Sequence, residues 1–377
     1  MLDFNLSRPQ EFMQRMLRDF MEKECPPTVV REAETTERGY DPALYRRLGE
    51  LGVLGFGLPK AEGGADGGWV DLAVLYEESG RALFPSPHLS SVVLGGGLLA
   101  RRGSAAQRQA WLRDLCSGAR VLAVGRPLGS GEPGASGLTA RTDNGGYRLS
   151  GEVAHVAQGI GADGYLLVAQ IADAPGRVGL FLAEPTTAGL RVSAQKMMHG
   201  EPLARLRLEE VRLPAEAAVG EPAPAAEVFG PLLDGAKVLV AAASLGGAEW
   251  CIDSAVAYAK ERYAFNRPIG AFQAIQHRLA NLAILVEETR LLTYTAAWQL
   301  EQGQDARRAA AMAKLKAAAA FREASVGCIL VHGGYGFMLE SNQQLYYRRA
   351  KALELSYGSP DAQRALIAAE HQSFIPA

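Results

Sequence analysis

The sequence has few cysteines and little net charge, and each shortage excludes a class of protein. Its four cysteines, Cys25, Cys116, Cys251 and Cys328, lie far apart and form no Cys-x-x-Cys pair. Neither a disulfide framework nor a metal site is therefore predicted, and the thiols are expected to be reduced and buried in a cytoplasmic protein. A formal net charge of -2 gives no general attraction to nucleic acid or to an anionic membrane.

Long uncharged apolar runs are missing as well. No such run approaches the roughly 20 residues that cross a bilayer, so no membrane span is predicted. Acidic residues and an arginine precede any apolar run at the N-terminus, so no signal peptide is expected. The hydrophobic fraction of 48% and the charged fraction of 21% are those of a globular protein, and 377 residues allow two or three domains.

The pattern along the chain changes twice, which predicts an α+β protein with three domains. Residues 1–118 are expected to be helical, 119–222 to form a β domain, and 223–377 to be helical again. In the first part, Asp41 followed by Pro42 is a good helix start, and a further helix is predicted at Val70–Ala82.

The middle part contains short β-type runs separated by glycine, proline, asparagine and aspartate. Such runs predict an antiparallel barrel or sandwich. They lie at Tyr147–Ser150, Gly164–Gln170, Val178–Ala183 and Leu203–Leu208. The last part is predicted to contain two long helices, at about 229–263 and 305–331.

One stretch, 258–277, combines a helix end, a break and a second helix. Arg262 is predicted in the last helical turn, where the helix dipole favours a cation and where a guanidinium could bind phosphate. Pro268 interrupts the helical geometry, and a new helix is expected from about Phe272. A helix hairpin with its polar side chains in solvent fits this spacing equally well.

The order of residues in this stretch resembles the signature of the acyl-CoA dehydrogenase family. The matching residues are Arg262-x-x-Phe265, Pro268-Ile269 and Phe272-Gln273-x-x-Gln276-His277. A Gly333-Gly334-Tyr335-Gly336 turn and a later Gly358-Ser359 pair also fit the family. The resemblance covers nearly the whole chain. It implies an N-terminal helical domain, a middle antiparallel β domain and a C-terminal four-helix bundle.

The resemblance also implies a chemistry, the desaturation of an acyl-CoA thioester with FAD as cofactor. In the family, the loop after the long helix holds the pyrophosphate and adenine end of a neighbouring subunit's FAD. The implied cofactor-binding residues are Arg262, Phe265, Gln273, Gly333, Gly334, Gly358 and Ser359. The implied partners are an electron-transfer flavoprotein or similar acceptor and other subunits in a homo- or hetero-oligomer, a dimer of dimers.

Residues that would serve the chain's own active site depart from the family pattern. The catalytic glutamate of the family is replaced by Tyr357, which is a poor base because a tyrosine phenol is neutral at working pH. The alternative base position is Ala236, and the nearby Asp234 lies about 200° away around the helix.

The segments that contact the flavin in the family also differ in this chain. Where the family has a threonine in the first of these segments, this chain has Gly125. Where the family has Trp-x-Thr, this chain has His155-Val156-Ala157. His155 is expected to be a structural histidine. The family usually has a glutamine three residues before the first glycine of the Gly333-Gly334-Tyr335-Gly336 turn, and this chain has Leu330 there.

These departures leave several interpretations open. The first is the non-catalytic partner subunit of a bacterial heterotetramer that desaturates steroid side-chain or other bulky acyl-CoA thioesters, in lipid or steroid catabolism. The second is a stand-alone dehydrogenase with Tyr357 or an unrecognised carboxylate as base, and the third is a flavin monooxygenase or oxidase on the same fold. A DNA-binding role is disfavoured by the near-neutral charge.

Overall fold

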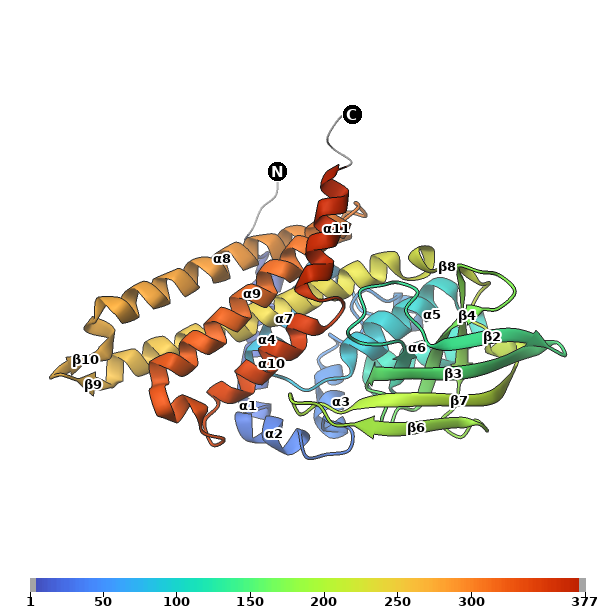
Figure 1. The fold of residues 1–377 in the computed structure, drawn as a ribbon, viewed down its shortest axis with the longest axis horizontal. Coiled ribbons are helices and arrows are strands. Elements are labelled where there is room, and N and C mark those ends of the chain that lie inside the picture. The colour runs from blue at the N-terminus through green and yellow to red at the C-terminus, as the bar shows by residue number, and fades with distance from the viewer. Residues whose placement is uncertain (1–4, 373–377) are drawn as a thin grey trace. The chain divides into compact units, whose positions relative to one another are not determined.

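The computed structural model describes residues 5–372, and the chain divides into two units (Figure 1). The helical unit comprises the residues up to Val30, Trp69–Phe84, and those from Lys237 onward. The sheet unit comprises Arg31–Gly68 and Pro85–Ala236. The predicted division into three domains stays a prediction.

The sheet unit is built on an eight-stranded sheet. Its strands run in the order β6-β7-β3-β2-β4-β5-β8, and β1 also pairs with β4. They are β1 (Leu122–Gly125), β2 (Leu138–Asp143), β3 (Gly146–Ala157), β4 (Gly164–Ile171), β5 (Arg177–Ala183), β6 (Leu190–Gln195), β7 (Leu203–Pro214) and β8 (Ala223–Pro224). The helical segments of this unit are α3 (Pro42–Glu50), η1 (Lys60–Glu62), η2 (Leu89–Gly96), α5 (Gly97–Arg102), α6 (Ala105–Ser117) and η3 (Ala215–Ala217).

Local sequence explains much of this sheet. The β2–β3 hairpin closes on Asn144 and Gly145, which both have positive φ, the geometry of the tight turn that Asn-Gly favours. Along β7, buried residues mostly alternate with exposed ones, which gives the strand one apolar face. The pairing is mainly antiparallel, as predicted, but β4 runs parallel to β1 and to β2. The four predicted runs lie within β3, β4, β5 and β7, whereas the other strands of this sheet, β1, β2, β6 and β8, were not predicted.

The helical unit is an assembly of long helices joined by short turns. Its elements are α1 (Arg8–Glu24), α4 (Trp69–Arg81), β9 (Tyr263–Ala264), β10 (Arg267–Pro268), η4 (Ile269–Ala271), α8 (Gln273–Glu301), α9 (Arg307–His332), η5 (Gly333–Phe337), α10 (Gln343–Leu355) and α11 (Pro360–Gln372). Helices α2 (Pro27–Ala33) and α7 (Ala225–Glu261) span a boundary between the units. An 18-residue window of α7 is long and apolar enough to cross a membrane, but 83% of it is buried, as in a core helix.

Glycines allow α7 to pack closely against its neighbours. A Cβ on Gly246 would lie 1.8 Å from the carbonyl oxygen of Glu77 in α4, and a Cβ on Gly80 in α4 would lie 1.9 Å from that of Ala243. A Cβ on Gly247 would lie 2.4 Å from the ring of Phe321 in α9. No real side chain fits such distances, so each substitution would force the helices apart.

A partly buried ion-pair network joins α4, α7 and α8. Arg290 Nη1 lies 2.8 Å from Glu77 Oε1, and Arg290 Nη2 also pairs with Glu249. The Tyr294 hydroxyl donates a hydrogen bond to Glu77 Oε2 at 2.6 Å. Burial, followed by the charge of Glu77, raises the pKa of Glu249 from 4.5 to about 7.

This pKa predicts a pH dependence of stability. Between about pH 4.5 and 7 the folded protein binds a proton on Glu249 that the unfolded chain has released. The contribution of Glu249 is therefore full below pH 4.5 and is lost as pH rises through about 7. Relative to Glu249→Gln, wild-type free energy of unfolding should fall by at most about 1.4 kcal/mol per pH unit in this window. Urea titrations from pH 5 to 8 measure it.

Glu287→Gln is the matched control, because Glu287 lies 3.8 Å from Arg290 Nε but is 68% exposed. We expect its pH profile to follow that of the wild type. Parallel profiles for the wild type and Glu249→Gln would contradict the prediction.

Candidate functional site

The break after α7 is a β-hairpin rather than the helix hairpin considered above. Ala264 pairs with Arg267, and the two turn residues, Phe265 and Asn266, have φ of 53° and 62°. Two successive positive φ values form the primed turn of a tight hairpin, a geometry that a phenylalanine adopts only under strain. The side chain of Phe265 is 90% exposed, and its ring meets that of Phe272 edge-on, with centroids 6.1 Å apart.

Arg262 lies one residue beyond the end of α7, where the prediction had placed it in the last turn. Its N–H still donates a hydrogen bond to the Tyr258 carbonyl at 2.9 Å, and its own carbonyl accepts one from Ile269 at 2.8 Å. Its side chain is exposed and has no ion-pair partner within residues 5–372. Gln273, the first residue of α8, is exposed as well. Both side chains are therefore available to a ligand or a partner.

The glycine turn follows α9 directly. Gly333 has φ 64° and ψ -141°, which requires glycine in practice. No atom lies within 4 Å of the position of a Cβ on Gly333 or on Gly334, and both residues are exposed. The turn thus presents bare backbone to its surroundings, and a ligand could approach it closely.

Arg262 and Gly333 emerge from the same end of the helical unit, because α7 and α9 run parallel. The two helices meet at Gly247 and Phe321, and further along at Tyr258 and His332, whose rings stack with centroids 4.3 Å apart. Tyr258 is one turn before Arg262, and His332 directly precedes Gly333. Sequence analysis missed this stacked pair, because each residue alone looks like an ordinary helix residue.

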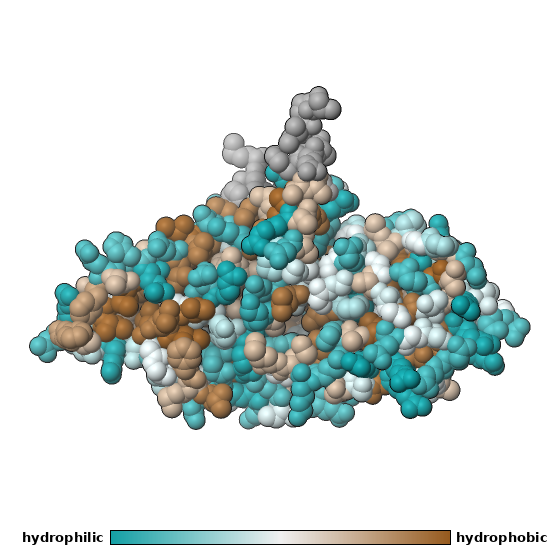
Figure 2. All heavy atoms as spheres, in the orientation of Figure 1, coloured by the Kyte–Doolittle hydropathy of each residue, from teal (hydrophilic) through white to brown (hydrophobic). Residues whose placement is uncertain are grey.

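Large apolar side chains are exposed at this end of the helical unit. Monomeric proteins rarely expose so many together, and such a patch indicates an interaction surface. They are Tyr263 (63%), Phe265 (90%), Leu330 (52%), Tyr335 (51%), Phe337 (71%), Met338 (48%) and Leu339 (78%). Figure 2 shows apolar surface gathered at the tip that carries β9 and β10.

The remaining predicted site residues lie at the opposite end of α10. This helix has 13 residues and is therefore about 20 Å long, and it runs antiparallel to α9. Gly358 has φ 102°, and the Ser359 hydroxyl accepts a hydrogen bond from the N–H of Ala362 in α11 at 3.3 Å. Gly358 and Ser359 thus have structural roles in this turn, whatever else they contact.

Tyr357 is buried in the same turn with φ 54°, a conformation that is strained for tyrosine. Gln363 in α11 donates hydrogen bonds to the carbonyls of Tyr357 and Gly358, at 3.2 and 3.3 Å. On the other side, buried Lys314 donates to the carbonyls of Leu353 and Glu354, at 2.8 and 3.0 Å. Hydrogen bonds to carbonyls before, at and after Tyr357 therefore hold the backbone of this turn.

Burial lowers the pKa of Lys314 to about 8, although the nearby Glu354 opposes the shift. The two hydrogen bonds that this ammonium donates both go to helix carbonyls, those of Leu353 and Glu354. It therefore acts on the end of α10 and is not placed by these bonds to activate the phenol.

In the sheet unit, the segment that follows Gly125 is held together by hydrogen bonds between its own residues. Arg126, 3% exposed, donates from Nη2 to the carbonyls of Ser130 and Glu132 and lies over the ring of Phe229. His155 was expected to be a structural histidine, but it is an exposed residue with φ 57° where the β3–β7 register shifts. Ala157 ends β3 and is partly exposed.

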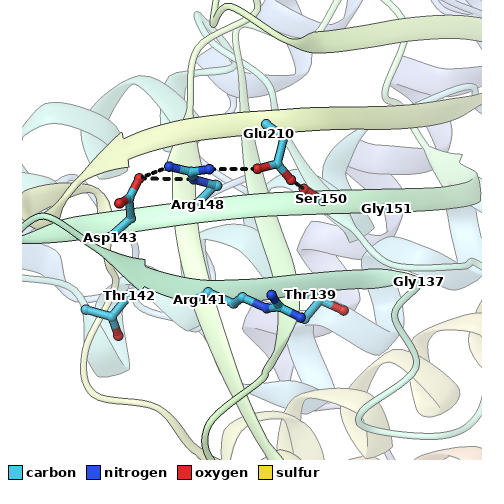
Figure 3. A pocket seen from close by; sticks show the side chains of 9 residues that line it. All are labelled: Gly137, Thr139, Arg141, Thr142, Asp143, Arg148, Ser150, Gly151 and Glu210. Atoms are coloured by element: carbon cyan, nitrogen blue, oxygen red, sulfur yellow. Dashed lines mark hydrogen bonds and ion pairs between the residues drawn. The ribbon is translucent and has the colours of Figure 1, made fainter.

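A polar hollow of about 520 Å³ lies elsewhere on the sheet unit, against β2 and β3 (Figure 3). It contains none of the predicted site residues. Its central cation, Arg148, is held between Asp143 and Glu210, at 2.6 and 3.0 Å. The two carboxylates neutralise Arg148, and we assign no binding role to the hollow.

Comparisons with known proteins match the chain along most of its length. The model of the acyl-CoA dehydrogenase N-terminal domain matches residues 7–119, and that of the C-terminal domain matches residues 227–371. The probable acyl-CoA dehydrogenase YngJ of Bacillus subtilis is 30% identical, over 97% of this chain and 99% of its own. The chain belongs to the acyl-CoA dehydrogenase family. The fold and the family predicted from the sequence are thereby confirmed.

Two further comparisons bear on the branch of the family. The human mitochondrial short-chain specific acyl-CoA dehydrogenase is 30% identical, over 96% of this chain and 90% of its own. A chain in the crystal structure of the ChsE4–ChsE5 complex from Mycobacterium tuberculosis is 30% identical, with a TM-score of 0.89 and 100% of both chains covered. The family thus includes similar chains from different settings, and the roles of the individual site residues stay predictions.

Phe265, the strained residue in the turn between β9 and β10, allows folding stability and subunit association to be tested separately. In Phe265→Gly the positive φ becomes unstrained. The edge contact with the Phe272 ring is lost, but little buried area is, because the Phe265 side chain is 90% exposed. We expect the stability of the isolated chain to be unchanged or to rise by about 1 kcal/mol. Association with other subunits should weaken about tenfold or more, because an aromatic contact is lost.

Asn266→Gly is the matched control, since it relieves the neighbouring strain and removes no aromatic ring. Urea unfolding and sedimentation velocity measure the two effects. Unchanged association of Phe265→Gly would show that the tip makes no subunit contact.

Proposed function

We propose that this chain is the subunit of an acyl-CoA dehydrogenase complex that lacks a catalytic base and completes the FAD site of a partner subunit. The observation that carries the proposal is the exposure of Arg262, Phe265, Gln273, Gly333 and Gly334 at one end of the helical unit. A site that served its own subunit would enclose such residues. Here they point outward among exposed apolar side chains, as residues offered to another chain do.

The residues at this end fit the phosphate part of a dinucleotide. The Arg262 guanidinium has no ion-pair partner in the described chain, and its fork of donors suits phosphate oxygens. The open backbone at Gly333 and Gly334 would let such a ligand lie against it. Arg262 would bind a phosphate, Gln273 would supply an amide, and Phe265 would pack beside them. When bound, FAD supplies the hydride acceptor for the desaturation.

The base is the function that this chain lacks. Proton removal from the α carbon of a thioester needs a carboxylate whose pKa is raised in a dry site. Tyr357 stands at that position, buried and fixed by Gln363, and a neutral phenol is a hydrogen-bond donor rather than a base. Ala236, at the alternative position, is fully buried and carries no proton acceptor. The partner would therefore supply the base.

The similarity to a chain of the ChsE4–ChsE5 complex supports a pairing of two different subunits. We extend the proposal to an acyl-CoA substrate with a bulky acyl group, such as a steroid side chain, and to an electron-transfer flavoprotein or similar acceptor. We place the complex in the cytoplasm, consistent with four free, buried cysteines. A stand-alone dehydrogenase is the second candidate, with Tyr357, the residue that the sequence resemblance assigns to the base position, acting as base; the hydrogen bond from Gln363 to its carbonyl supports a fixed position for it.

Arg262→Ala tests the phosphate contact in the assembled complex. A charge-assisted hydrogen bond of this kind contributes about 1.5–3 kcal/mol, so we expect FAD retention to weaken at least tenfold. Arg278→Ala is the matched control, since Arg278 is also exposed and lies five residues beyond Gln273. Flavin fluorescence after gel filtration measures retention. Equal losses in the two variants, or none, would remove the proposed role of Arg262.

The assembly predicts a stoichiometry of one FAD for each pair of chains. In a symmetric homodimer a defect in either set of FAD contacts empties every site, whereas two different chains can divide the work. Co-expression with a partner that carries the catalytic glutamate, followed by flavin and protein quantification, gives the ratio. One FAD per chain in the protein purified alone, with turnover lost in Tyr357→Phe, would instead establish the second candidate.

A further inference from the structure

The loop between α9 and α10, residues 333–342, is exposed at its tip and buried at its base. Phe337 and Leu339 in this loop are 71% and 78% exposed. The residues that flank the loop, His332 at the end of α9 and Gln343 at the start of α10, are only 7% and 6% exposed. The imidazole Nε2 of His332 lies 3.0 Å from the side-chain nitrogen of Gln343. Two hydrogen-bonded polar side chains are therefore buried together at the base of an exposed loop.

The partners of the imidazole assign its proton. Nδ1 of His332 lies 2.8 Å from the carbonyl oxygen of Cys328, which can only accept, so Nδ1 carries a proton and donates it. The side-chain nitrogen of Gln343 can only donate, so Nε2 of His332 accepts and carries no proton. We therefore assign His332 as the neutral imidazole with its proton on Nδ1, and Gln343 as the donor of the bond between the two ends of the loop.

Helix α7 contacts both of these side chains. The ring of Tyr258 stacks on the imidazole of His332 with centroids 4.3 Å apart. The hydroxyl of Ser254 accepts a second hydrogen bond from the Gln343 nitrogen at 3.4 Å. The side-chain oxygen of Gln343 is buried and has no hydrogen-bond partner in the described part of the chain. A buried amide with an unpaired oxygen lowers stability, so the two bonds made by the nitrogen are what favours glutamine at this position.

The loop also packs against the end of α9. A Cβ on Gly336 would lie 2.7 Å from the carbonyl oxygen of Ile329, so the loop backbone touches the helix there. The Ser341 hydroxyl donates a hydrogen bond to the Gly336 carbonyl at 3.2 Å. The bond from Ser341 acts within the loop, whereas the bond between His332 and Gln343 ties its two ends together.

We propose that His332 and Gln343 are positioning residues, whose buried hydrogen bond holds the 333–342 loop in shape. The bond joins the residue directly before Gly333 to the first residue of α10, so it controls how the glycine turn is presented. The opposite end of α10 is bound separately by Lys314, so loss of the bond is expected to free the loop rather than the helix. The consequence for a partner's FAD rests on the proposed function, whereas the effect on the loop does not.

Three variants separate the hydrogen bond from ring packing. His332→Phe keeps a ring for Tyr258 to stack on but removes both nitrogens. Gln343→Met keeps the length of the side chain but removes the donor. His332→Gln is the conservative control, because its side-chain oxygen can accept in place of Nε2 and so restore the bond to Gln343.

Hydrogen–deuterium exchange of the purified full-length chain, read by peptide mass spectrometry, measures the loop. His332→Phe and Gln343→Met should each speed amide exchange in residues 333–342 about fivefold or more, as the loss of a buried hydrogen bond implies. Exchange in α11 should not change, and His332→Gln should match the wild type. Because both single variants break the same bond, the double variant should exchange no faster than either one.

Nitrogen-15 NMR of the wild type with labelled histidines tests the assigned proton directly, at an alkaline pH where a free imidazole is neutral. The His332 signals, identified by their absence in His332→Gln, should show a protonated Nδ1 and a bare Nε2. The spectrum decides the direction of the bond even where His332→Phe or Gln343→Met does not fold. A proton on Nε2 instead of Nδ1, unchanged loop exchange in both of these variants, or equally fast exchange in His332→Gln would each overturn the proposal.

FAD retention in the assembled complex tests the link to the proposed function separately. We expect His332→Phe to retain FAD less well than His332→Gln, because only the first variant frees the glycine turn. Faster loop exchange with equal FAD retention in the two variants would keep the positioning role and remove its link to the cofactor.

Discussion

The contact of α7 with its neighbours through glycine is the constraint on which the helical unit depends. Gly246 on α7 and Gly80 on α4 bring these two helix backbones so close that no larger residue fits, and Gly247 leaves room for the ring of Phe321 in α9. Alanine-rich packing around Ala241, Ala242 and Ala313 continues the same close approach. Because α9 runs parallel to α7 and contacts it at Phe321 and at His332, the ends of both helices reach the same region. The register between Arg262 and Gly333 is therefore set in the core, far from either residue.

Polar groups are open to solvent at one end of α10 and are hydrogen-bonded and buried at the other. At the end near Gly333, backbone and side chains are open, and apolar side chains such as Phe337 and Leu339 face solvent. At the other end, Tyr357 is buried and its flanking carbonyls are bonded by Lys314 and Gln363. The turn at Tyr357 is thus closed and held by hydrogen bonds, whereas the turn at Gly333 is open to solvent.

Sequence patterns predicted the helices and strands that are determined by residues close together in the chain. The helix start at Asp41 and Pro42, for example, is confirmed by the hydrogen bond that the Asp41 carboxylate accepts from Ala43. The hairpin at Phe265 could not be found this way, because positive φ at phenylalanine is imposed by the surrounding structure against local preference. The short strands β1 and β6 also depend on partners distant in sequence, and their pairing is not encoded in their own residues.

The exposed apolar tip has a consequence for the life of the chain in a cell. An unassembled copy would display Phe265, Tyr263 and Leu339 in the way that a misfolded protein displays its interior. Chaperones and proteases recognise such surfaces, so free copies would be removed while assembled copies persist. In the proposed assembly, the abundance of this chain would then follow that of the chain that covers the tip.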